Sequence, residues 1–181
     1  MMTFETRERG GSEARLSLPR NLSPALDNKA LAALVLEAVR RVGDRELNPP
    51  VAGNSGLAFR PRALLALLTY CYAIGVYGSQ DVEVMMYEDA DFRALFGMEF
   101  PDWKQLRNFR RHNPAVLRQA LEETFKGVWR LQGGIGRGTD AGGAEATRAV
   151  AECATEIFEG FSEEAQARLE RAMFIDHMAM E

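Results

Sequence analysis

The sequence predicts an all-α protein: a compact multi-helix domain with a helix-turn-helix-like core and a C-terminal helical hairpin. Apolar residues recur at spacings of three and four along most of the 181 residues, and no stretch alternates with the period of two that is typical of a strand. Capping residues and prolines stand before several of these stretches, which marks helix starts. Between residues 60 and 130 the expected helices follow one another through very short connections.

The composition predicts one folded core with appended segments. A chain of this length that is 46% hydrophobic can bury a core without covalent crosslinks. We expect a flexible N-terminal arm over 1–21, a helical domain over 22–131, a Gly-rich linker over 132–143 and a C-terminal helical segment over 144–181. The glycines at 133–138 resemble a phosphate-binding loop only superficially, because no strand precedes them.

Within the helical domain, each helix is predicted from its own start and stop residues. Ser23 followed by Pro24 should begin a helix that ends near position 43, and an irregular connection follows. Pro61 should open the most apolar helix, which we expect to lie at the centre of the core. Ser79 and Asp89 should cap two short helices, and Asn113 with Pro114 should start a long one.

A short helix at 103–112 is predicted to separate apolar from cationic side chains. Asp102 can act as its N-cap, with Gln105 completing a capping box. At about 100° per residue, one side should carry the packing residues and the other should face water. The packing side comprises Trp103, Leu106 and Phe109, and the water-facing side comprises Lys104, Arg107, Asn108 and Arg111.

Positive charge is concentrated around this helix although the chain has a formal net charge of −4. Residues 104–118 contain five lysines or arginines and no acid, a local excess that suits contact with phosphates. The competing interpretation is a solvated arginine face without a partner. Arg110 lies at the edge of the apolar side, so we expect it to pair with an acid in the segment 87–91.

The remaining composition argues against several classes of site. The two cysteines, Cys71 and Cys153, form neither a disulfide framework nor a metal-binding pattern, which fits a reducing cytoplasm. Neither His112 nor His177 has a second ligand at metal-binding spacing, so no metal or cofactor is expected. The longest apolar run, at 63–77, is too short to span a bilayer, and no signal peptide is visible. We therefore expect a soluble cytoplasmic protein.

The C-terminal segment should form two helices, the second capped by Ser162. An apolar stripe runs through Val150, Cys153, Ile157, Phe158 and Phe161, and acids should occupy the outer face. This stripe must be buried either against the protein's own core or against a second copy, so a homo-oligomer is one of two expectations.

Five blocks carry a family resemblance. They are a proline-led leucine helix at 61–68, YAIGVY at 72–77, SQ at 79–80, YEDADFR at 87–93 and PDWKQLRNFRR at 101–111. In this order and spacing they resemble the N-terminal domain of bacterial insertion-sequence transposases of the InsH-like, DDE-type family. The resemblance covers about 70 of the 181 residues and implies a helical domain that binds DNA.

The chain departs from the family in two respects. Gln80 stands where the family has arginine, and residues 104–106 replace a polar residue, a threonine and an isoleucine, so the DNA contacts that the resemblance implies are altered. The family also has a following RNase H-like domain, whose carboxylates bind two metal ions for strand transfer. About 50 residues follow Arg130, too few for that domain, and we therefore expect no enzyme activity.

The sequence thus favours a non-catalytic, transposase-derived DNA-binding protein that recognises transposon ends or regulatory DNA. Lys104, Arg107, Asn108 and Arg111 are expected to reach a groove, and Arg60, Arg62 and Arg118 to contact phosphates. The alternative is a helical interaction or oligomerisation module, for instance one that partners an intact transposase, and its support is the net negative charge. A remnant transposase fragment without a role is the third interpretation.

Overall fold

The computed structural model confirms the all-α fold. It describes residues 21–22, 26–43, 46–48, 60–96, 100–132 and 144–179, and this part of the chain contains seven helices and no strand. The helices are α1 (Asn28–Arg41), α2 (Pro61–Ile74), α3 (Ser79–Glu88), α4 (Ala90–Phe96), α5 (Trp103–His112), α6 (Pro114–Leu131) and α7 (Ala144–Met178).

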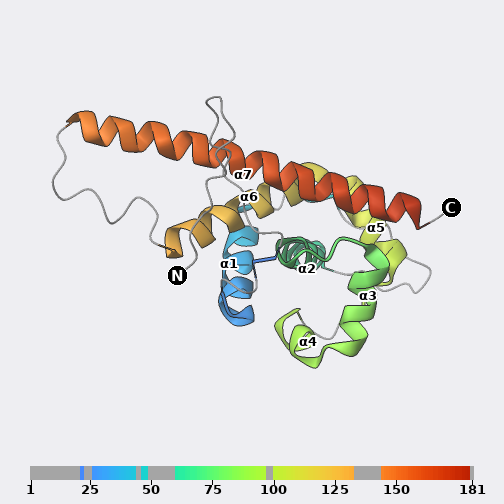
Figure 1. The fold of residues 1–181 in the computed structure, drawn as a ribbon. Coiled ribbons are helices and arrows are strands. Elements are labelled where there is room, and N and C mark those ends of the chain that lie inside the picture. Colours follow the sequence, from blue (N-terminus) through green and yellow to red (C-terminus); the bar gives the residue numbers. More distant parts are fainter. Residues whose placement is uncertain are drawn as a thin grey trace.

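Helix α2 is the centre of the core, as its composition predicts. Every side chain from Leu64 to Ala73 is buried, because α1, α6 and the α3–α5 region pack around it. Figure 1 shows α2 between α1 and α3, with the long helix α7 lying across α6. Gly75 ends α2 in the left-handed region at φ 90°, which a residue with a side chain rarely adopts. Burial also raises the pKa of the Cys71 thiol, which makes it a poor nucleophile.

The local structure of α5 confirms the predicted capping box. The Gln105 amide N–H donates to Asp102 Oδ1 at 2.7 Å, and the Asp102 amide N–H donates to Gln105 Oε1 at 2.9 Å. A third acceptor comes from α3, since Glu83 Oε2 accepts from the Trp103 amide at 3.3 Å. These bonds satisfy amide donors that a helix start leaves without partners, so α5 is fixed firmly at its first turn.

Two other helix starts differ in detail from the prediction. Helix α1 begins at Asn28, where Asp27 Oδ1 accepts the Ala30 amide at 2.6 Å; Ser23 and Pro24 lie outside the described residues. Helix α3 begins with Ser79 itself, so that Gly78, which has no side chain, is its N-cap.

Helix α6 begins at Pro114 as predicted, but the side chain of Asn113 does not cap it. Instead Asn113 Oδ1 accepts from the Asn48 amide at 2.7 Å, and its side-chain amide donates to the carbonyl oxygens of Asn48 and Phe109. Asn113 therefore ties residues 46–48 to the end of α5, because its two polar atoms are already engaged by the preceding chain.

The predicted C-terminal hairpin is wrong. Residues 144–178 form the single helix α7, and Ser162 lies inside it rather than at a helix start. The reason is a continuous buried stripe: Phe161, Ala165, Leu169 and Ala172 all lie in the core that α6 and α2 help to form. Because this stripe packs mainly along a single helix, α6, an unbroken helix is favoured over a turn. This part of the C-terminal segment therefore folds back onto its own chain.

Several predictions fall on residues that the structure leaves undescribed. They concern the arm at 1–20, most of the connection at 49–59, the glycines at 133–138 and the side chains of Val150 and Cys153. Among the described helices, none is by itself long and apolar enough to cross a membrane; α2 and α3 reach that measure only as a pair, and they are bent by 98°.

Candidate nucleic-acid interface

Helix α5 exposes a cationic stripe, by which we mean Lys104, Asn108 and Arg111. These residues are four and three positions apart, so they lie on one face of the helix. Lys104 and Arg111 are exposed and Asn108 is half-exposed. No ion pair within the described part of the chain involves either cation; Lys104 Nζ instead lies 5.4 Å from the centre of the Trp103 ring. The stripe therefore presents positive charge to solvent.

The prediction that Arg107 also faces water is wrong. Its side chain is only 8% exposed and already takes part in interactions within the fold. The sequence assigned a narrow packing face to α5, but α3, α2 and α6 contact it from several directions. Gln105, Leu106, Phe109 and Arg110 are buried as well, so the packed arc spans about 200° when residues are placed about 100° apart. Arg107 falls within this arc.

Of the three arginines predicted to contact phosphates, two are exposed and one is engaged by hydrogen bonds within the fold. Arg60 and Arg118 are exposed, on the N-cap of α2 and on α6 respectively. Arg62 instead donates to the carbonyl oxygens of Val39 and Val42 at 2.9 and 3.0 Å. Its guanidinium thus caps the end of α1, where unpaired carbonyls favour a cation, and this is a structural task.

Beneath the stripe, a buried ion pair joins α5 to α7. The Arg110 guanidinium, 1% exposed, donates through Nη2 to Asp176 Oδ2 and through Nη1 to the Tyr72 hydroxyl at 2.9 Å. An ion pair was expected for Arg110, but with an acid at 87–91; the partner is an α7 residue 66 positions away in sequence.

Asp176 also caps the start of α3, although it lies 97 positions after Ser79 in the sequence. Its Oδ1 accepts the Ser79 amide at 2.8 Å and its Oδ2 accepts the Ser79 hydroxyl at 2.6 Å, so the carboxylate takes the place that the N-cap Gly78 cannot fill. A Cβ on Gly78 would lie 3.3 Å from Ile175 Cγ2, which shows how closely α7 approaches this helix start.

A buried arginine of α7, Arg168, caps the end of α2 on the other side of the connection between α2 and α3. Arg168 is 0% exposed, and its Nη1 donates to the carbonyl oxygens of Tyr72 and Ala73 at 2.9 and 3.0 Å. Its Nε donates to Glu164 at 2.7 Å, and its guanidinium carbon lies 4.9 Å from the centre of the Phe125 ring. Helix α7 thus holds both the end of α2 and the start of α3.

Burial dominates the acid–base properties of this network. It raises the pKa of Tyr72 far above its usual value, and the neighbouring Arg110 only partly opposes the rise. Burial by itself acts to lower the pKa of Arg110, but Tyr72 and Asp176 outweigh it, and the net shift is upward. Arg110 therefore stays charged and Tyr72 stays neutral at physiological pH, so the hydroxyl remains available to accept from the guanidinium.

Sequence reasoning missed Ser79, Asp176 and Arg168 as members of one cluster. The sequence indicated Ser79 only as a helix cap. The bonds span long separations, 97 positions between Ser79 and Asp176, and 96 and 95 between Arg168 and the carbonyls of Tyr72 and Ala73. The one available signal was Arg168 itself, which lies at the spacing of the apolar stripe Phe161, Ala165 and Ala172 and so falls on a buried face.

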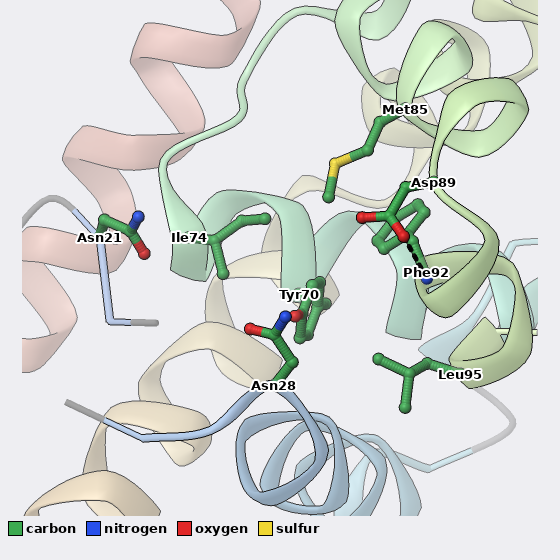
Figure 2. Close-up of a pocket in the computed structure, with 8 residues that line it drawn as sticks. All are labelled: Asn21, Asn28, Tyr70, Ile74, Met85, Asp89, Phe92 and Leu95. Atoms are coloured by element: carbon green, nitrogen blue, oxygen red, sulfur yellow. Dashed lines mark hydrogen bonds between the residues drawn. The ribbon is translucent and has the colours of Figure 1, made fainter. Parts of the chain in front are cut away.

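A separate pocket of about 150 Å³ lies among α2, α3 and α4, shown in Figure 2. Tyr70 forms one wall, and Asp89, which accepts the Phe92 amide at 2.9 Å, forms another. Burial raises the pKa of the Tyr70 hydroxyl to about 12. No residue of the cationic stripe lines this pocket, so the two features are distinct.

The described residues contain no group of three or more His, Cys, Asp or Glu side chains that could hold a metal ion. In the comparisons with known proteins, the chain matches no family model, no curated protein and no solved structure. The exposed stripe and the buried network below it are the features of the described chain that bear on function.

Proposed function

We propose that this protein is a non-catalytic, transposase-derived DNA-binding protein that acts in the cytoplasm on transposon ends or regulatory DNA. The observation that carries the proposal is the cationic stripe: two exposed cations and an amide on one face of a firmly capped helix, in a chain of net charge −4. A globally acidic protein that keeps one helix face cationic and unpaired has a local field that attracts phosphates.

The side chains suit different contacts with a duplex. Arg111 can donate two hydrogen bonds to a guanine edge. Asn108 can donate one hydrogen bond to adenine N7 and accept one from the adenine N6 amino group, whereas Lys104 acts as a point charge. The exposed Arg118 and Arg60 suit phosphates, which position a protein on DNA without reading its sequence. Arg107 and Arg62 take no direct part, because the fold already engages them.

The resemblance described above supports the same assignment. Its most basic block, at 101–111, coincides with the capping box and the stripe of α5. The residues in that block that the fold buries, such as Phe109 and Arg110, hold the helix in place, and the residues between them face solvent. An element of this kind can enter a major groove if its neighbours leave the exposed face uncovered.

The triple variant Lys104→Ala, Arg111→Ala and Arg118→Ala should weaken DNA binding at least tenfold at about 50 mM salt. Each lost phosphate contact should also reduce the slope of log K against log salt by about 0.9. Fluorescence anisotropy with a labelled terminal-repeat duplex and a random duplex, over a salt series, measures both quantities. All three residues are exposed and unpaired within the described chain, so the free energy of unfolding should change little.

The matched control removes the same charge elsewhere, by Lys29→Ala, Arg40→Ala and Arg130→Ala on α1 and α6, where all three residues are exposed. It should weaken binding far less than the stripe variant does. Equal losses in the two variants would mean that only net charge matters, and absence of binding by the unmodified protein at about 50 mM salt would remove the proposal.

A second function, protein association, is favoured by a different surface. Val84 and Tyr87 of α3 are 51% and 62% exposed, and Phe100 is 36% exposed. The Tyr87 and Phe100 rings are stacked at 5.2 Å. Exposed acids flank this aromatic patch in the sequence, namely Glu88, Asp91 and Asp102, so it repels DNA but suits a protein surface.

If the patch mediates self-association, the variant Tyr87→Ser with Phe100→Ser should sediment as a smaller species than the unmodified protein and keep its DNA affinity. Analytical ultracentrifugation at several protein concentrations measures the first property and anisotropy the second. Phe174→Ser removes an aromatic side chain of similar exposure from α7 and should leave the size unchanged. A monomeric unmodified protein would exclude self-association through this patch.

A further inference from the structure

The end of α7 is held to the body of the protein by a buried carboxylate, with the half-buried Ile175 packed beside it. Between residues 173 and 178, Asp176 is the only buried residue, whereas Met173, Phe174, His177 and Met178 are exposed. Most helix ends are buried through their apolar residues. Here most apolar residues are exposed, Ile175 is half-buried against the core, and the buried polar residue points inward, to Ser79 and Arg110.

The residues that bind Asp176 belong to two helices: α5, which carries the proposed DNA surface, and α3, which packs against α5. Ser79 is the first residue of α3, and α3 contacts α5 directly. Glu83 of α3 also accepts a hydrogen bond from the Trp103 amide in the first turn of α5. Arg110 belongs to α5 itself and lies one residue before Arg111 of the cationic stripe. A single carboxylate therefore fixes the start of one helix and the inner side of the next.

Arg110 has no other buried acid to replace this partner in the described chain. Its other hydrogen-bond partner among the described residues is the neutral Tyr72 hydroxyl, and its Nε atom is buried without a hydrogen bond. If Asp176 is neutralised, the guanidinium is left buried without a counter-charge, and it must move toward water to regain solvation. Because Arg110 and Arg111 are consecutive on one rigid helix, that movement displaces the stripe.

We infer that Asp176 is a positioning residue for DNA binding: docked at Ser79 and Arg110, it holds α5 in the pose that presents Lys104, Asn108 and Arg111 together. This inference rests on the proposed function and deepens it, since it makes the end of α7 a regulator of the same surface. The expected change in DNA affinity on removing Asp176 is opposite in sign to the change that charge alone would cause. Removing an acid should strengthen DNA binding through charge alone, but removing this acid weakens it.

The test compares Asp176→Asn with Glu163→Gln, in the full chain. Both variants remove one negative charge from α7, but Glu163 is exposed and has no bond to another helix among the described residues. Measured by anisotropy at low temperature, where circular dichroism shows both proteins to be folded, Asp176→Asn should bind a duplex about tenfold more weakly than the unmodified protein. Glu163→Gln should bind equally well or slightly better.

Hydrogen exchange without DNA provides a second, independent readout. In Asp176→Asn, amide exchange should become faster at the end of α7, the start of α3 and in α5, and should stay unchanged in α1 and α6. Acceleration throughout the chain would indicate general loss of stability and overturn the positioning role, as would unchanged exchange. DNA binding by Asp176→Asn that equals or exceeds that of Glu163→Gln would overturn it too.

The two proposals fail in different ways. If the unmodified protein does not bind DNA, the proposed function is wrong, and the exchange experiment still decides whether Asp176 fixes α3 and α5. If the unmodified protein binds and the stripe variant does not, but Asp176→Asn binds normally, the DNA-binding function stands and the positioning role of Asp176 is overturned.

Discussion

Replacing Arg110 with alanine should lower the free energy of unfolding by about 3–5 kcal/mol, the usual cost of breaking a buried ion pair from one side. The variant leaves the Asp176 carboxylate buried with only the two Ser79 donors, and it leaves the Tyr72 hydroxyl without its guanidinium partner. A cavity adds to the loss, because Arg110 is among the largest fully buried side chains. Urea denaturation followed by circular dichroism measures the change.

The neighbouring residue supplies the control for this prediction. Arg111→Ala removes the same type of side chain from an exposed position of the same helix, so its effect should stay within about 0.5 kcal/mol. The paired substitution Arg110→Met with Asp176→Leu should recover only part of the lost stability, because apolar residues can replace a buried ion pair but leave the Ser79 amide and hydroxyl without their acceptor. A loss below about 1 kcal/mol for Arg110→Ala would show that the ion pair contributes little.

Replacing Arg168 with alanine should cost about 2–4 kcal/mol. The side chain is fully buried, donates to two of the last three carbonyls of α2 and covers the Phe125 ring. Those carbonyls keep other donors, because Gly75 N–H reaches Tyr72 and Leu22 N–H reaches Ala73. The loss should therefore be somewhat smaller than for Arg110, and thermal or urea unfolding measures it.

Arg171, one turn further along α7, provides the comparison. It is half-buried and donates to the Tyr77 hydroxyl at the longer distance of 3.3 Å, with its guanidinium carbon 5.2 Å from that ring. Arg171→Ala should cost about 1 kcal/mol, in line with a single partly exposed contact. Equal losses at 168 and 171 would contradict the expectation that the fully buried Arg168 contributes more to stability than the half-buried Arg171.

Local features of this fold could be predicted from the sequence because their causes lie within a few residues. The capping box of Asp102 and Gln105 and the first-turn prolines Pro61 and Pro114 all appear where the pattern places them. The same holds for the apolar surface of α2, whose buried residues follow from composition alone. Propensity and capping act at short range, and a single sequence displays them directly.

The candidate site could be predicted only in part, because burial depends on distant elements. The sequence identified Lys104 and Arg111 as outward-facing residues, but it could not know that α5 is packed on several sides, which removes Arg107 from the surface. It also could not choose the acid that pairs with Arg110. Several carboxylates were equally plausible, and the one selected, Asp176, depends on α7 folding back as a single helix.

The way α3 is capped has a consequence for folding during synthesis. The acceptor for the Ser79 amide is 97 residues later in the chain, which corresponds to about 5–20 s of translation at typical rates of about 5–20 residues per second. Until Asp176 leaves the ribosome, Arg110 has no counter-ion and the first turn of α3 has no carboxylate. We therefore expect the nascent basic helix to be loosely oriented, and the surface we assign to DNA to be completed only after Asp176 has been synthesised and released.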